Sequence, residues 1–184
     1  MKYELTNNTI THLGRTLYQI KALKDFGNVK KSDLGGWIEK EDNLSHHGNA
    51  WVFDNACISD NACVSGNARV SGNARVSGNA RVSGNACVSG NVRVSDNACI
   101  SDNACISDNA CVSDNAYVLN NKSLLTIELL DDNRVITLTK SNKKIKAGCF
   151  CGSYEEFEKL VNDKYKKRSD YHIFLPTIKE WLNS

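Results

Sequence analysis

The sequence is poor in the residues that build a mixed hydrophobic core. Proline and methionine occur once each, and aromatic residues make up 8% of the 184 residues. Asn, Ser, Val and Ala are instead crowded into the middle third of the chain. A composition biased in this way indicates an architecture of short repeated units rather than a mixed globular core.

Strong charge and long apolar runs are missing as well. The formal net charge is +2, from 23 basic and 21 acidic side chains, which is unlike a nucleic-acid-binding tail or a polyanion. No apolar run has the length of a membrane span, and the first twenty residues do not resemble a signal peptide. We therefore expect a cytoplasmic protein with neither a membrane nor nucleic acid as its partner.

Cysteine is frequent, but its spacing argues against a disulfide framework. Six of the eight cysteines share one six-residue period: Cys57, Cys63, Cys87, Cys99, Cys105 and Cys111. Cysteines that occupy a repeat position are expected to be free thiols, so the count does not indicate a small secreted domain.

A hexad of pattern N-A-x-[VI]-S-[GD] begins at Asn49 and can be laid down twelve times without a gap, ending at Asn120. An α-helix turns by about 600° over six residues, so its apolar stripe would drift around the surface. In a strand, by contrast, Ala and Val/Ile two positions apart point to one side, and the variable residue between them points to the other. The hexad therefore predicts one short strand with an apolar inner side.

The Ser-Gly-Asn and Ser-Asp-Asn triplets between these strands have the chemistry of tight turns, because Gly and Asn tolerate positive φ and Asp and Asn bond the local backbone. Three strands and three corners close a coil of eighteen residues, and stacked coils pair each strand with those above and below at roughly 4.8 Å. We predict a mainly β, three-sided parallel β-helix of about four to five coils.

The order of residues in Val64-Ser65-Gly66-Asn67-Ala68-Arg69 is similar to the motif of hexapeptide-repeat proteins, which form left-handed parallel β-helices. The resemblance covers about 72 residues. It implies the handedness of the coil, which the period alone does not give.

Outward residues eighteen positions apart should stack on one side of the prism, which defines three faces. Face one carries Trp51, Arg69, Cys87 and Cys105; face two carries Cys57, Arg75, Arg93 and Cys111; face three carries Cys63, Arg81, Cys99 and Tyr117. Arginines spread over three faces do not form a nucleic-acid track. Arg75 and Arg93, neighbours on one face, suggest an anion between them.

The thiols on these faces favour a surface that is covered by another copy or by the C-terminal segment, because cysteine is usually buried. A zinc or redox site at Cys87 and Cys105 is disfavoured, since zinc needs four convergent ligands. For Cys149 and Cys151, packing is favoured over metal binding, because no second ligand pair is in view. We expect no metal and no cofactor.

The flanks divide the chain into three predicted parts. Residues 1–48 form an N-terminal β cap with a strand at 16–26 and a first irregular coil near Trp37, in which Leu44 takes an Ala position. Residues 49–120 form the β-helix. Residues 121–184 form a small α+β element with a hairpin (SLLTIELL, RVITLTK), a short strand IKAGCF, a helix capped by Ser153 and Glu156, and a last amphipathic helix from Asp170.

The words LGGWIEKEDNLS, NAWV, NARV and AGCF, with an EEF segment, resemble uncharacterised proteins common in phages and prophages. Some small phage proteins inhibit host defence, so the resemblance implies a non-enzymatic binding or scaffold protein in the host cytoplasm, a dimer or trimer that binds a host protein or sequesters a nucleotide-like anion. The basic contact residues predicted for it are Arg69, Arg75, Arg81, Arg93, Lys143, Lys144, Lys166, Lys167 and Arg168.

The alternative is an acyltransferase that uses acetyl-CoA, as many hexapeptide proteins are. His46 or His47, at the first coil, would then be the general base. The hexads run without an inserted loop, and no partner that would orient either imidazole is evident from the sequence. These two observations favour the non-enzymatic interpretation.

Overall fold

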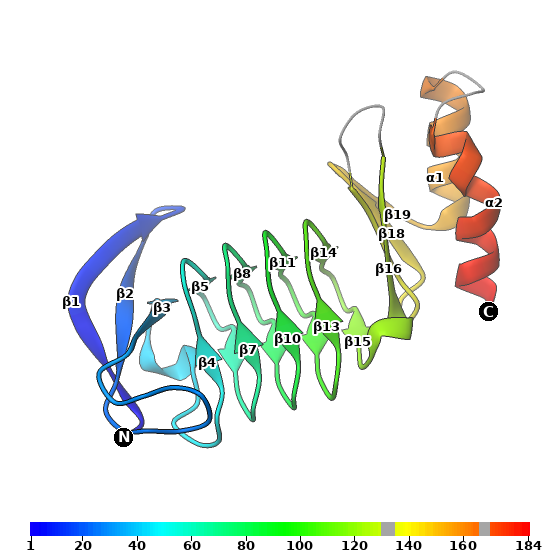
Figure 1. Cartoon of the computed structure of the whole chain (residues 1–184). Helices are drawn as coiled ribbons and strands as arrows, with labels where there is room; N and C mark the ends of the chain where they lie inside the picture. Colours follow the sequence, from blue (N-terminus) through cyan, green and yellow to red (C-terminus); the bar gives the residue numbers. More distant parts are fainter. Residues whose placement is uncertain (130–134, 166–169) are drawn as a thin grey trace.

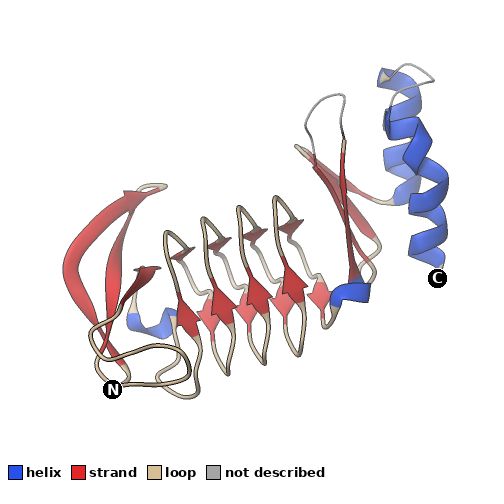
Figure 2. Cartoon of the chain, in the orientation of Figure 1, coloured by secondary structure: helices blue, strands red, loops and turns tan. Residues whose placement is uncertain are grey.

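The computed structural model describes residues 1–129, 135–165 and 170–184. It is a three-sided β-solenoid of about five turns, with an antiparallel β cap at one end and a sheet with two helices at the other (Figures 1 and 2). The predicted three-sided β-helix is thus confirmed. Among the described residues, no helix has the length and apolar character needed to cross a membrane.

Each hexad forms one two-residue strand, as the repeat predicts. The strands are β4 Trp51–Val52, β5 Cys57–Ile58, β6 Cys63–Val64, β7 Arg69–Val70, β8 Arg75–Val76, β9 Arg81–Val82, β10 Cys87–Val88, β11 Arg93–Val94, β12 Cys99–Ile100, β13 Cys105–Ile106, β14 Cys111–Val112 and β15 Tyr117–Val118. They form three parallel sheets, β4-β7-β10-β13 on face one, β5-β8-β11-β14 on face two and β6-β9-β12-β15 on face three. The predicted stacking of outward residues is therefore confirmed on every face.

The inside of the solenoid is filled by the two apolar positions of the hexad. Along the repeat these Ala, Val and Ile side chains are at most 2% exposed. At the corners the Gly/Asp position has positive φ, with 67° at Gly66 and 58° at Asp96. A Cβ on Gly66 would lie 3.0 Å from the backbone of Gly84 in the next coil, so neighbouring corners stack closely.

The corner asparagines form ladders that run along the prism. The Asn67 side-chain amide, for example, donates to the Oδ1 of Asn85 one coil later at 3.1 Å. The same contact links Asn91 to Asn109 at 3.0 Å. Each ladder adds a side-chain hydrogen bond per coil to the backbone pairing.

The N-terminal cap extends the sheet of face two. Strands β1 (Tyr3–His12) and β2 (Arg15–Ala22) form a hairpin, and β3 (Leu34–Ile38) joins it to β5, which gives the order β1-β2-β3-β5-β8-β11-β14. The strand predicted at 16–26 is β2, which ends four residues earlier, and β1 is an additional strand. The cap therefore covers the exposed edge of the first coil.

The first coil is two residues longer than the others, and this corrects the predicted register. Leu44 bridges Val64, twenty positions on, rather than taking an Ala position. The 3-10 turn η1 (Glu41–Asn43) precedes it, and the Asn43 amide donates to the carbonyl of Ala62 at 2.8 Å. The extra residues are accommodated in the corner Ser45-His46-His47-Gly48-Asn49, where later corners have Ser-Gly-Asn.

The C-terminal element has its own hydrophobic core. After η2 (Asn121–Ser123), strands β16 (Leu124–Glu128), β17 (Val135–Thr139), β18 (Lys144–Ala147) and β19 (Phe150–Gly152) form an antiparallel sheet beside helices α1 (Tyr154–Lys164) and α2 (Asp170–Asn183). The hairpin and both helices are confirmed, including the capping box of Ser153 and Glu156. The turn predicted at residues 131–133 lies outside the described residues.

One predicted strand is wrong. The segment IKAGCF is not a single strand, because the chain reverses at Gly148, whose φ of 59° is in the left-handed region, and continues as β19. The sequence signal for this turn was the glycine itself, which accepts positive φ without a side-chain penalty.

Side chains of the C-terminal element also satisfy the open edge of the last coil. In the inner coils the outward residue donates its N–H to a carbonyl one coil later, as Cys87 does to Ala104. In the last coil, side-chain oxygens replace that carbonyl: the N–H groups of Cys105, Cys111 and Tyr117 donate to Asn121, Thr137 and Ser141, respectively. This fixes the C-terminal sheet against the end of the prism.

Candidate functional site

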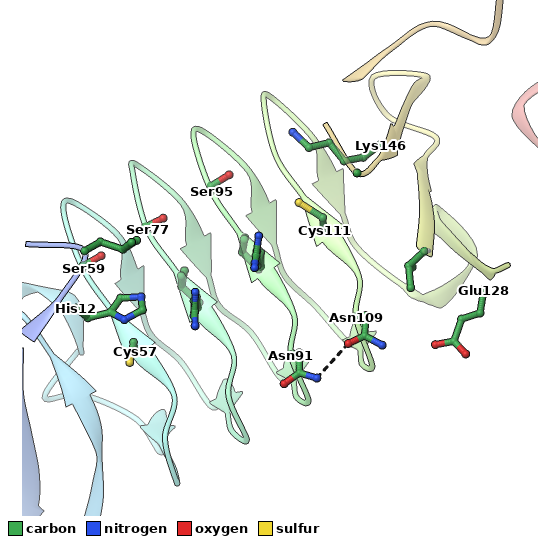
Figure 3. Close-up of a pocket in the computed structure, with 17 residues that line it drawn as sticks. His12, Cys57, Ser59, Ser77, Asn91, Ser95, Asn109, Cys111, Glu128 and Lys146 are labelled. Carbon is green, nitrogen blue, oxygen red and sulfur yellow. Dashed lines mark hydrogen bonds between the residues drawn. The ribbon is translucent and has the colours of Figure 1, made fainter. Parts of the chain in front are cut away.

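A groove of about 980 Å³ lies on face two (Figure 3). Its floor is the outward row of the four face-two strands, namely Cys57, Arg75, Arg93 and Cys111. Three strand spacings make this floor roughly 14 Å long. We call this cavity the face-two groove.

Two walls from opposite ends of the chain close the face-two groove. At one end stands the tip of the β1–β2 hairpin, with His12 and Leu13. At the other stands the C-terminal sheet, with Glu128, Lys146 and Gly148. The same two elements flank the repeat in Figure 1, and both walls belong to one chain.

Ion pairs hold the hairpin tip over the first coil. Arg15, three residues after His12, pairs with Glu39 at 3.0 Å and with Asp60. Glu39 also accepts the backbone N–H of Asp60 at 2.6 Å. The hairpin tip is thereby tied to the corner next to Cys57, which fixes where the wall stands.

Leu13 at this tip has an unusual backbone conformation. Its φ is 49°, a region that disfavours residues with a Cβ, and its side chain is 83% exposed while lining the face-two groove. Leu13 and Gly14, whose φ is 78°, form the two-residue turn between β1 and β2, and a type I′ hairpin turn requires positive φ at both of its central residues.

The centre of the floor is basic. Arg75 and Arg93 are Cα partners in adjacent parallel strands, and both side chains are exposed. Lys146 adds a third positive charge at the C-terminal wall and Glu128 one negative charge. Among the described residues, neither arginine has an ion pair or a side-chain hydrogen bond.

His12 is the titratable group at the other wall. Burial, and secondarily the positive charge of Arg75, hold the pKa of His12 below its ordinary value, so the ring is neutral at pH 7. Its Nε2 is shielded from solvent and has no hydrogen-bond partner among the described residues. Because Nε2 is shielded from solvent, the other ring nitrogen, Nδ1, is the one that can accept a proton from a molecule bound in the groove.

The two thiols of the floor are poor nucleophiles. Burial raises the pKa of both Cys57 and Cys111, so both are protonated at neutral pH. Cys57 donates to the Asn55 carbonyl at 3.3 Å. They lie beneath the two walls, which accords with the expected covering by the C-terminal segment at Cys111, whereas Cys105 on face one is exposed.

The structure separates the predicted basic residues. Arg75 and Arg93 line the face-two groove, whereas Arg69 is on face one and Arg81 on face three. Lys143 and Lys144 line a smaller cavity of about 330 Å³ beside α1 and α2. The remaining three, Lys166, Lys167 and Arg168, lie outside the described residues.

The two histidines proposed for catalysis from sequence do not line the face-two groove. His46 stacks on Tyr3 with ring centroids 4.3 Å apart, and its Nδ1 accepts the backbone N–H of Lys2 at 3.2 Å. Burial is the main cause of its lowered pKa. His46 thus joins the cap to the first coil, while His47 is exposed in the same corner.

Sequence reasoning did not select His12, Leu13, Glu128 or Lys146. The available signal was the tip sequence His12-Leu13-Gly14-Arg15, in which a histidine and a leucine stand at a glycine turn. That signal does not show that the hairpin tip lies next to face two, because the tip and the face-two strands come together only in the folded chain. Within the described residues, no cluster of three or more His, Cys, Asp or Glu is arranged to hold a metal ion.

Comparison with known proteins identifies the repeat. The family model described as the YdcK beta solenoid repeat matches four overlapping stretches, residues 62–78, 68–84, 74–90 and 80–96. The chain thus carries a β-solenoid that is like those of hexapeptide-repeat proteins. The four matches of this solenoid include Arg75 and Arg93 but neither wall of the face-two groove.

A curated relative carries a related stretch. It is the Escherichia coli (strain K12) protein named uncharacterized acetyltransferase YdcK, which is 45% identical over 38 residues. The match covers 21% of the solenoid protein and 12% of that relative, so the chain spans far less than two thirds of the relative's length.

This relative corrects the prediction that the protein is not an enzyme. A protein with a closely similar stretch is named as an acetyltransferase, so that prediction is wrong. The physical reason for the error is that an uninterrupted run of hexads excludes only a loop inserted in the coil, while the walls of the face-two groove come from outside the repeat. Neither comparison supports the expected action against a bacterial defence system.

Proposed function

We propose that the solenoid protein is an acyltransferase whose reaction takes place in the face-two groove, with His12 as the general base. The observation that carries the proposal is a neutral imidazole at the wall of a large basic groove. The name of the E. coli relative supports the same reaction class.

The proposed step needs one proton acceptor and one acyl donor such as acetyl-CoA. An amine or hydroxyl acceptor attacks the thioester carbonyl while the His12 ring takes the proton of the attacking group. The carbon–sulfur bond then breaks, and the leaving thiolate takes the proton from His12. Proton, acyl group and charge balance without any further reagent.

The basic floor suits an anionic donor. Arg75, Arg93 and Lys146 outnumber Glu128, and a cleft lined by one sign of charge raises the local concentration of ligands of the opposite sign. Because one chain supplies both walls and the floor, the proposed site does not require a second copy. The expected dimer or trimer stays a prediction.

The test is turnover of acetyl-CoA in the presence of mixed amine and alcohol acceptors, with free CoA measured by liquid chromatography. His12→Gln keeps the size and polarity of the side chain but removes the base, and we expect it to lower the rate on the order of 100-fold to 10,000-fold. His47→Gln is the matched control, since His47 is exposed and outside the face-two groove.

Three outcomes are informative. Turnover that is lost in His12→Gln and kept in His47→Gln supports the proposal. Equal rates in both variants would remove His12 as the base, and the absence of turnover in the unchanged protein with every acceptor would remove acyl transfer.

A further inference from the structure

The four outward arginines of the repeat do not have the same neighbours. Arg69 lies between Trp51 and Cys87 in its sheet, and Arg81 between Cys63 and Cys99. On face two, Arg75 and Arg93 are direct partners in adjacent strands. Face two is thus the place in the repeat where two guanidinium groups stand side by side, roughly 4.8 Å apart at the backbone.

Two adjacent positive charges are unfavourable unless an anion lies between them. No carboxylate of the described chain pairs with either arginine. Asp54 and Asp60 show the contrast, because these corner carboxylates accept backbone N–H groups of the next coil instead. The pair is therefore left with its anion-binding capacity unused.

Neutral hydrogen-bonding groups flank the arginine pair. Asn91 and Asn109 run along one side of the floor, and Ser77 and Ser95 along the other (Figure 3). Asn91 donates to Asn109, and Asn109 is the last of this ladder, so its own Nδ2 has no bond to a further asparagine among the described residues. The Ser77 hydroxyl, in the coil of Arg75, and the Asn109 amide, in the coil after Arg93, each offer a hydrogen-bond donor along the floor.

We propose that Arg75 and Arg93 together bind a phosphate or diphosphate group of a small-molecule substrate. The guanidinium fork matches phosphate oxygens in pairs, and two forks one strand apart can hold neighbouring oxygens of one phosphate or of a diphosphate. Lys146 at the wall adds positive charge on the same side. The identity of the ligand as a substrate rests on the proposed function, while the binding itself does not.

A phosphate group at this position can belong to either of two molecules, and a competition experiment distinguishes them. The phosphate belongs either to a nucleotide-linked acyl donor or to a phosphate ester acceptor. Leu13, exposed at the wall, would contact the apolar part of either molecule.

Binding is measured with inorganic pyrophosphate by isothermal titration calorimetry at low ionic strength, where screening is weakest. The test variant is Arg75→Gln with Arg93→Gln. The matched control is Arg69→Gln with Arg81→Gln, which removes the same two charges from the same repeat position on faces one and three. We expect affinity to fall by on the order of tenfold or more in the test variant and to change little in the control.

Equal losses in the two double variants would overturn the proposal, because they would mean that net charge alone attracts the anion. So would the absence of pyrophosphate binding to the unchanged protein. All four arginines are exposed, and circular dichroism checks that each variant keeps its β signal. If the test variant does not fold, the variant Arg75→Lys with Arg93→Lys keeps the two charges and removes the guanidinium groups. Undiminished pyrophosphate binding in that variant would overturn the claim that paired guanidinium donors bind the phosphate.

Competition then identifies the source. Displacement of pyrophosphate by CoA but not by glucose 6-phosphate assigns the pair to the donor, and the reverse result assigns it to the acceptor. If neither CoA nor glucose 6-phosphate displaces pyrophosphate, the proposal that the arginine pair binds a phosphate ester is overturned. Because these assays need no turnover, pyrophosphate binding without acetyl transfer would refute the proposed function and leave the phosphate site standing.

Discussion

Face two and face three are built from the same hexad, yet the groove of about 980 Å³ lies on face two. Their inner residues are equally buried, their corners have the same positive φ, and both carry arginine in the outward position. The difference lies outside the repeat, because the N-terminal sheet continues from face two and the C-terminal strand β17 contacts β14 of the same face. The repeat supplies a uniform surface, and the flanking elements decide which part of it becomes a site.

The largest expected effect tests whether the faces are equivalent inside. Val76→Ala on face two, Val82→Ala on face three and Val88→Ala on face one each remove the same buried atoms. We expect each change to lower the free energy of unfolding by about 2 kcal/mol. Urea unfolding measures it, and a much larger cost on face two would show that this face also differs in its interior.

The next prediction concerns the outer surface. We expect iodoacetamide to modify Cys105 on face one on the order of tenfold faster than Cys57 on face two, because only the thiolate reacts and burial disfavours it at Cys57. Peptide mass spectrometry at pH 8 gives both rates in one sample. Comparable rates would mean that the hairpin wall does not protect the floor.

A third prediction uses the charge of Arg75 on His12. A positive neighbour disfavours the imidazolium and so lowers the pKa of His12. In Arg75→Gln that pKa should rise, which moves the acid limb of the pH profile of the proposed acetyl transfer to higher pH. Arg75→Lys keeps the charge and should leave the limb in place, and Arg81→Gln on face three is the control. If the acid limb does not move in Arg75→Gln, the charge of Arg75 does not control the pKa of the proposed base.

The smallest expected effect is on the wall itself. Arg15→Ala removes ion pairs whose arginine side chain is 43% exposed, so we expect a loss of stability below about 1 kcal/mol. The same change frees the hairpin tip, and pyrophosphate affinity should fall slightly. Lys30→Ala, which removes another exposed pair of the cap with Asp25, is the control and should leave affinity unchanged.

Much of the fold followed from local pattern. The period of six and the alternation of Ala and Val around an outward residue were enough to predict the coil, its corners and the stacking of Arg75 on Arg93. The first coil was harder, because His46 and His47 lengthen one corner and shift Leu44 by two positions. The turn at Gly148 was missed because IKAGCF alternates well enough to suggest a single strand.

The candidate site was only half predictable. The sequence pointed to the Arg75 and Arg93 pair as an anion site, and it named His46 and His47 as the general base only for the alternative of an acyltransferase. In the structure His46 packs on Tyr3, whereas His12, which has no motif around it, stands at the groove.

The sequence by itself determined a three-sided solenoid and the residues that each face displays, because a strand of two residues and a tight corner are set by neighbours within the same hexad. Only the tertiary structure decided that one face becomes a groove bounded at both ends, with His12 at one end and Lys146 at the other. Those residues reach face two through sheet pairing and edge contacts between segments far apart in the chain, and no local pattern encodes such pairings.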